Sequence, residues 1–113
     1  MSAVDARQIR RTYTAALAGP RTGTLSPAAA EERARLAGLL YGQLQHLVPV
    51  VEAELPRIDS RFSQSAAQYV LTEARAVLYD LDAPSGGDTR PAKTVFDLAT
   101  LARSLLVLHE YAA

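Results

Sequence analysis

The sequence predicts an all-α protein, a single four-helix up-down bundle whose second helix is kinked by a proline. Apolar residues recur every three or four positions along almost the whole chain, and no segment alternates as a strand would. Leu and Ala supply 16 and 21 of the 113 residues. Segments that contain proline and glycine interrupt the periodicity, which divides one domain over residues 1–113 into four helices.

The first helix is expected over residues 5–18. Asp5 is a natural N-cap, and Gly19-Pro20 ends the helix. The predicted inner stripe consists of Ile9, Tyr13, Ala16 and Leu17.

The second helix is expected over residues 27–55, with Ser26 as N-cap and Pro27 at the first helical position. Pro49 falls inside the apolar pattern, which resumes after it. Because proline removes one backbone hydrogen bond and clashes with the carbonyl of Gln45, we expect a kink rather than an end. The predicted inner stripe consists of Leu36, Leu40, Leu44, Leu47, Val51 and Leu55.

The third and fourth helices are expected over residues 60–82 and 91–111. The loop 83–90 between them is rich in Gly, Pro, Ser and Asp. The predicted inner face of the third helix consists of Phe62, Ala66, Val70, Val77 and Leu81. That of the fourth consists of Val95, Leu98, Ala102, Leu105, Leu106 and His109.

The composition excludes several classes of protein. Without cysteine the chain holds no disulfide, zinc finger or thiol nucleophile. It contains no Glu-x-x-His pair, glycine-rich phosphate loop or Gly-x-Ser-x-Gly motif, so we expect no metal and no cofactor. No apolar run approaches the roughly 20 residues of a membrane span, and the N-terminus lacks the apolar stretch of a signal peptide, so we expect a cytoplasmic protein without membrane contact.

The charges are unevenly distributed although the net charge is zero. Residues 1–35 carry six Arg against three acidic residues, and the rest of the chain carries the balancing excess of acid. Arg7, Arg10 and Arg11 on the first helix could contact DNA, or they could lie against the acidic remainder of the same fold. Zero net charge favours the second interpretation, so nucleic acid is not the expected partner.

Glu73 is the one candidate for a catalytic group. At 100° per residue it lies about 60° from Val70, close to the predicted inner face. A carboxylate there must be paired, hydrogen-bonded or protonated. It is either a general base in a bundle cavity or a structural partner of Arg103. A cavity at the Pro49 kink would be lined by Tyr41, Gln45, Tyr69 and Glu73, with Arg103 and His109 as further candidates.

Two other features invite interpretation. His109 faces inward in the last turn, where we expect a satisfied core residue or a favourable charge at the negative end of the helix.

A second stripe on the second helix lies opposite the core stripe. It predicts either a self-association or partner surface, or burial under the first helix. This second stripe consists of Leu39, Gly42, His46, Val50 and Ala53.

The chain resembles a family of small actinobacterial proteins of unknown function that are loosely described as natural product biosynthesis proteins. The resemblance covers about residues 39–111, with a weaker likeness at Ile9–Tyr13. It is carried by Leu40-Tyr41-Gly42, Leu47–Glu52, Glu73-Ala74-Arg75, Leu101–Ser104 and Leu108. The chain departs from the family pattern at Gln43, Val50, His109-Glu110 and Tyr111-Ala112, which argues against a shared catalytic group at these positions.

The resemblance implies a small helical accessory protein of specialised metabolism, and it supplies no reaction. Two classes of function therefore remain open. The first is a non-catalytic adapter that forms a homodimer or docks onto a larger protein. The second is a small-molecule-binding protein or cofactor-free enzyme, of cyclase or isomerase type, that takes a biosynthetic intermediate near Pro49 and Glu73. A DNA-binding regulator is a third, less favoured possibility.

Overall fold

The computed structural model describes residues 4–19, 25–58, 61–82 and 91–112, and these residues form helices without any β-strand. The predicted all-α class and the four helices are confirmed, while the expected loop 83–90 lies outside the described residues. The elements are α1 (Ala6–Ala18), α2 (Pro27–Glu54), the 3-10 helix η1 (Leu55–Arg57), α3 (Arg61–Asp82) and α4 (Pro91–Ala112).

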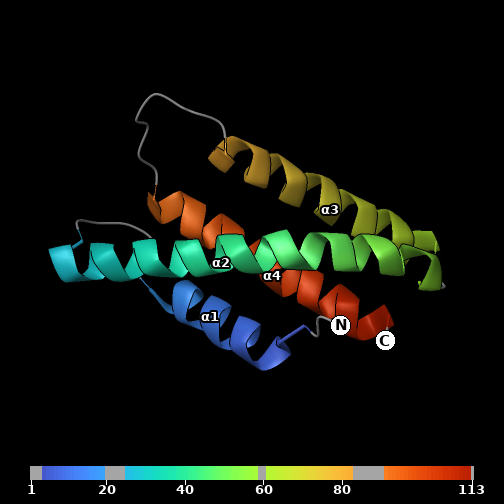
Figure 1. Ribbon diagram of the computed structural model, residues 1–113, viewed down its shortest axis with the longest axis horizontal. Helices are drawn as coiled ribbons and strands as arrows, with labels where there is room; N and C mark the ends of the chain where they lie inside the picture. Colours follow the sequence, from blue (N-terminus) through green and yellow to red (C-terminus); the bar gives the residue numbers. More distant parts are fainter. Residues whose placement is uncertain (1–3, 20–24, 59–60, 83–90, 113) are drawn as a thin grey trace.

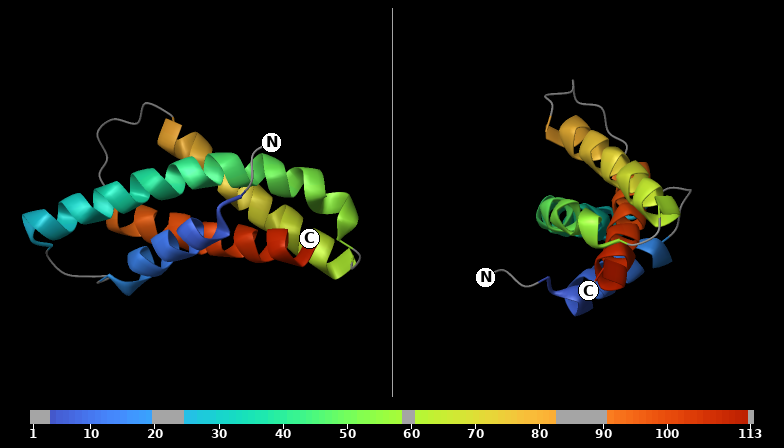
Figure 2. Two further views of the ribbon diagram at one scale, coloured as in Figure 1. Left: turned by 60° about the horizontal axis from the view of Figure 1, so that its bottom comes forward. Right: turned by 90° about the vertical axis from the view of Figure 1, so that its right-hand side faces the viewer.

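The four helices run alternately up and down, as predicted (Figure 1). The largest interface joins α2 to α4, which run parallel to each other, and α1 and α3 lie on opposite sides of this pair (Figure 2). The cross-section is therefore a flattened rhombus with α2 and α4 on its short diagonal. We attribute this to α4, whose buried and half-buried residues together occupy most of its circumference and so need neighbours on several sides.

Side-chain caps define the starts of the first two helices. The Asp5 carboxylate accepts a hydrogen bond from the backbone N–H of Gln8 at 3.1 Å. The Ser26 hydroxyl accepts one from the backbone N–H of Ala29 at 3.1 Å. Both caps satisfy N–H groups that have no partner within the helix, as the sequence predicts.

α2 continues through Pro49, and its ribbon changes direction in the green part of the helix (Figure 2). Pro49 is exposed, whereas the preceding Val48 is buried. A proline on the solvent side is tolerated because the carbonyl that loses its intrahelical bond can be hydrated. The predicted kink without an end is confirmed.

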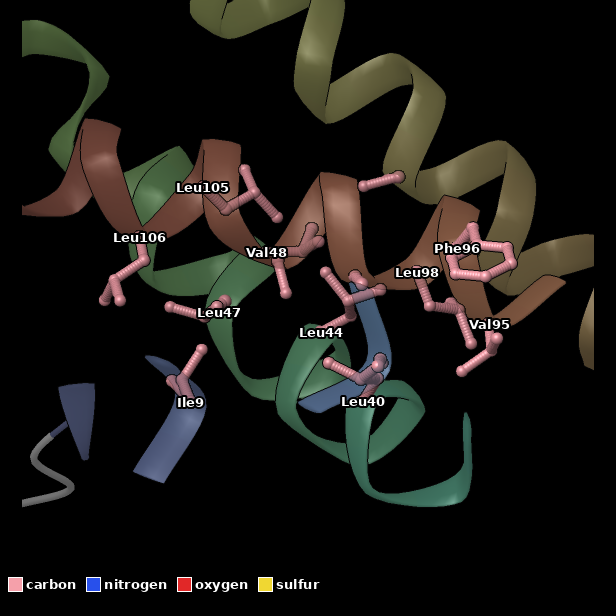
Figure 3. Close-up of a cluster of buried hydrophobic side chains, with 14 of the residues drawn as sticks. Ile9, Leu40, Leu44, Leu47, Val48, Val95, Phe96, Leu98, Leu105 and Leu106 are labelled. Atoms are coloured by element: carbon pink, nitrogen blue, oxygen red, sulfur yellow. The ribbon is translucent and has the colours of Figure 1, made fainter. Parts of the chain in front are cut away.

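The core lies between α2 and α4 and is closed by α1 on one side and α3 on the other. Ile9 of α1 points toward Leu47 and Leu106 in the close-up of Figure 3. The predicted stripes of α2 and α4 are confirmed, except that Leu55 and His109 are only half-buried. The largest fully buried side chains are Leu40, Leu44, Leu47, Val51, Ile58, Leu71, Val95, Leu98, Leu105 and Leu106.

The predicted inner face of α3 is wrong by about one residue. Its buried side chains are Ala67, Leu71 and Ala74, whereas Ala66 is exposed and Val70 and Val77 are half-buried. The side chains of Phe62 and Leu81 lie outside the described part of the chain. Two adjacent stripes of α3 are apolar, and the one with small alanines faces the core because it allows a closer helix approach.

Candidate functional site

The residues of the predicted cavity near Pro49 do not form an enclosed site. Tyr69 is 68% exposed, and Gln45 is exposed as well, whereas Tyr41 is half-buried. Glu73 and Arg103 are also exposed. Exposed side chains do not exclude water, which general base catalysis in a bundle cavity would require.

The predicted position of Glu73 near the core is wrong, because the face of α3 that is buried carries Ala67, Leu71 and Ala74. With Ala74 buried, the neighbouring Glu73 points about 100° away from the core. The expected structural pair with Arg103 is not formed either, because the ion pairs of the described residues include neither side chain. The α2–α3 ion pair of this region joins Arg75 to Glu52 instead.

His109 is a satisfied residue at the edge of the core, as predicted. Its Nδ1 lies 2.8 Å from Oε1 of Glu54, and the two side chains are 23% and 15% exposed. The contact joins the last turn of α4 to the last turn of α2. It holds the imidazole of His109 against the end of α2.

The second stripe of α2 is divided between a groove and solvent. Leu39, Gly42 and His46 line an open groove beside α1, while Val50 is half-buried and Ala53 is exposed further along. We call this feature the α1/α2 groove. It has a volume of about 420 Å³ and is lined by Asp5, Gln8, Ile9, Gly38, Leu39, Gly42, Gln43 and His46. α1 thus lies beside part of the second stripe of α2 but leaves that part open to solvent through the groove.

A hydrogen-bond chain crosses from α1 to α2 and includes Gln8 and Gln43, which line this groove. The Thr12 hydroxyl donates to the carbonyl of Gln8 at 2.8 Å, and Nε2 of Gln43 donates to the same hydroxyl oxygen at 3.1 Å. Oε1 of Gln43 is buried and has no hydrogen-bond partner within the described residues. A buried acceptor without a donor costs about 1–3 kcal/mol, so the atom marks a place where a donor would be stabilising.

A second surface feature lies between α3 and α4. An apolar groove of about 290 Å³ is lined by Ala66, Val70, Arg103, Ser104, Val107 and Leu108. Val107 is 57% exposed. Tyr69, which precedes Val70 in α3, is 68% exposed, and Tyr111, one turn after Val107 in α4, is 60% exposed. Among the described residues, these three are the large hydrophobic side chains that are exposed to solvent. We call the groove residues with Tyr69 and Tyr111 the α3/α4 face.

The arginines of α1 are exposed, and one of them contacts the acidic part of the fold. Nη2 of Arg10 lies 2.7 Å from Oε2 of Glu110, and this hydrogen bond raises the pKa of the Arg10 guanidinium above its ordinary value. Arg7 and Arg11 are exposed beside it. The contact of Arg10 with Glu110 agrees with the interpretation that α1 lies against the acidic remainder of the molecule.

In the described part of the chain, no three His, Cys, Asp or Glu side chains come together as metal ligands would. None of the described helices combines the length and the apolar character that crossing a membrane requires.

Sequence reasoning missed the Gln8–Thr12–Gln43 chain and the α3/α4 face. Thr12 offered a signal, because it lies between Ile9 and Ala16 on the inner face of α1 and a buried hydroxyl needs a partner. Val107 and Tyr111 offered another, because they are spaced four residues apart on the outer face of α4.

Comparison with known proteins identifies a family. Residues 7–113 match a family of unknown function (DUF6415), which covers all four helices. No curated protein matches the chain, and no solved structure does. The protein therefore belongs to the DUF6415 family of unknown function.

Proposed function

We propose that this protein is a non-catalytic helical binding module that forms a homodimer through the α3/α4 face and serves as an adapter for a larger protein. The observation that carries the proposal is the apolar groove between α3 and α4, which contains exposed Val107 and whose helices also carry exposed Tyr69 and Tyr111 next to its lining residues in sequence. Contiguous apolar surface on a small protein is typical of an interaction site. Tyrosines are enriched at such sites because they combine a large apolar area with a polar tip.

The charges on this face favour a second copy of the chain as the occupant. Glu73 lies one turn of α3 beyond Val70, and Arg103 lines the groove from α4. Both are exposed, and neither takes part in an ion pair of the described residues. In a two-fold dimer the same surface is used twice, so Glu73 of one copy can meet Arg103 of the other in two equivalent pairs.

Two further points support self-association. The net charge of the chain is zero, so two copies do not repel each other at long range. A stable interface needs about 800 Å² from each partner, a small part of the 7219 Å² surface of this protein. The adapter role, and an association with actinobacterial natural product biosynthesis, belong to the proposal and rest on the resemblance described above.

Sedimentation velocity and native mass spectrometry of the purified chain test the dimer. We expect a species of twice 12.2 kDa. Val107→Glu should weaken it at least tenfold, because the interface would bury an unpaired carboxylate. Ala53→Glu is the matched control: it adds the same charge to the exposed end of the second stripe of α2 and should leave the dimer intact.

Charge reversal tests the symmetric pairing. Glu73→Arg and Arg103→Glu should each weaken the dimer by placing like charges together, and the double variant should restore it. A chain that stays monomeric at high concentration would overturn the proposal. Loss of the dimer in Ala53→Glu but not in Val107→Glu would move the interface to α2. Single variants that weaken the dimer without rescue by the double variant would refute the proposed pairing.

A further inference from the structure

α1 contributes few of the buried side chains of the bundle. Its buried residues are Ile9, Thr12 and Ala16, of which Ile9 alone is a large apolar side chain. Of the ten largest fully buried side chains in the described part of the chain, eight lie on α2 and α4 and none lies on α1. Because apolar burial is the main source of stability, α2 and α4 hold each other more firmly than they hold α1.

The contact between α1 and α2 is incompletely filled. The α1/α2 groove leaves about 420 Å³ open beside it. At the contact itself, Nε2 of Gln43 donates to the Thr12 hydroxyl at 3.1 Å, while Oε1 of the same amide is buried and has no partner among the described residues. If α1 departs, water enters this contact and the amide can form all of its hydrogen bonds. The docked arrangement therefore carries a desolvation cost that the open arrangement avoids.

A second polar contact joins α1 to α4 at the protein surface. Nη2 of Arg10 and Oε2 of Glu110 are 2.7 Å apart, and the two side chains are 49% and 46% exposed. An exposed ion pair of this kind adds little stability and is screened by salt. The attachment of α1 to α4 should therefore weaken as the ionic strength rises.

α1 also completes its own ends. The Asp5 carboxylate caps the start of the helix by accepting from the backbone N–H of Gln8. At the other end the backbone N–H of Gly19 donates to the carbonyl of Ala16 at 3.4 Å. The departure of α1 therefore breaks neither of these caps.

We propose that α1 is a releasable helix, which leaves the α2–α4 pair as one unit while α2, α3 and α4 stay folded. Its release uncovers an apolar strip that includes Leu47 and Leu106, the side chains toward which Ile9 points (Figure 3). Proteins open locally at their least firmly held elements before they unfold globally. α1 is then a cover over a second apolar surface. It lies on the opposite side of the pair from α3 (Figure 2), so the proposal is independent of the dimer.

Thiol labelling tests the release because the chain contains no cysteine of its own. Ala16→Cys on α1, Ala74→Cys on α3 and Ala102→Cys on α4 each place one thiol at a buried position. With iodoacetamide, a neutral reagent, the Ala16→Cys variant should react at least about a hundredfold faster than the other two, after correction for the rates of the urea-unfolded chains. Low concentrations of urea should accelerate its labelling less than theirs, because release of one helix exposes less surface than global unfolding does.

Removal of the surface ion pair should favour the open arrangement. In the Ala16→Cys background and at low salt, Glu110→Gln should raise the labelling rate by about two- to fivefold, and added NaCl should then have little further effect. Glu31→Gln is the matched control. It removes an exposed carboxylate of α2 that takes part in no ion pair of the described residues, and it should leave the rate unchanged.

Hydrogen exchange of the unmodified chain checks that the introduced thiol does not itself release α1. Isolated helices shorter than about 12–15 residues are marginal in water, so released α1 loses its hydrogen bonds. Its backbone amides should exchange at least about tenfold faster than those of the buried residues of α2 and α4.

Three results would overturn the proposal. They are equal labelling of the Ala16→Cys and Ala102→Cys variants with the same dependence on urea, labelling of Ala74→Cys as fast as that of Ala16→Cys, and exchange of the α1 amides as slow as that of the α2 core. A chain that is monomeric at every concentration would refute the dimer and leave these expectations in place.

Discussion

Gly42 occupies an exposed position in the middle of α2, where glycine is less favourable than alanine. Glycine loses more backbone freedom than alanine when a helix forms, and it contributes no side-chain contact. A Cβ atom at this position would meet no other atom within 4 Å, so no contact within the domain requires glycine here.

Gly42→Ala should therefore stabilise the protein. We expect the free energy of unfolding to rise by about 0.5–1 kcal/mol, the difference in helix propensity between the two residues. Urea denaturation followed by circular dichroism measures the change. Ala34→Gly, at an exposed position of the same helix, is the control and should lower the free energy of unfolding by a similar amount. A destabilised Gly42→Ala variant would show that the backbone at this position is approached by another part of the molecule.

Individual residues of the candidate sites were predicted unevenly. His109 has the partner that a histidine in an apolar stripe near a helix end needs, and Glu54 supplies it, although the side chain is half-buried rather than buried. The partner itself could not be named, since it depends on where α2 ends relative to α4. The orphan oxygen of Gln43 was beyond sequence reasoning because it results from how α1 docks on α2.

At the scale of the helices, the orientation of an element was predictable where the sequence has one dominant apolar stripe. The stripe of α2 from Leu36 to Val51 consists of Leu and Val, and it is buried as expected. α3 has two neighbouring apolar stripes, and the larger side chains of Val70 and Val77 favoured the wrong one. The choice depends on how closely α3 packs on α2 and α4, which local periodicity does not determine.

The orientation of α3 can be tested with two alanines that are adjacent in sequence but differ in burial. Ala67→Leu should lower the free energy of unfolding by about 1–3 kcal/mol, because the position is fully buried and the added carbons would be overpacked. Ala66→Leu, at an exposed position, should change it by less than about 0.5 kcal/mol when both variants are measured in the Val107→Glu background, which removes the proposed dimer contact of the α3/α4 face. Thermal or urea denaturation distinguishes the two. The reverse order of effects would support the face that the sequence first predicted.

For the molecule as a whole, the flattened cross-section separates α1 from α3. Each packs on the central α2–α4 pair, and they lie on opposite sides of it (Figure 1). Side chains that are far apart and share no partner usually affect stability additively, whereas a hydrogen-bonded pair does not. Substitutions on α1 and on α3 should therefore change the free energy of unfolding independently of each other.

A double-mutant cycle measures this independence. Ile9→Ala on α1 and Leu71→Ala on α3 should each cost about 2–5 kcal/mol, and their sum should match the double variant to within about 0.5 kcal/mol. Glu54→Ala with His109→Ala is the control pair, since these side chains are 2.8 Å apart and should show a coupling energy above 0.5 kcal/mol. Strong coupling between Ile9 and Leu71 would indicate that the central pair transmits changes from one side to the other.

The interfaces of α4 also have a consequence for how the protein is made. α4 packs on α2, α1 and α3, and it follows all three in the chain. A ribosome therefore synthesises three helices whose apolar stripes lack their main common neighbour. Most of the stability of helices in proteins comes from tertiary packing of their apolar faces, so the earlier part of the chain has little to hold it together at that stage. The emergence of the α4 segment should then be the event that allows the nascent chain to collapse into its native arrangement.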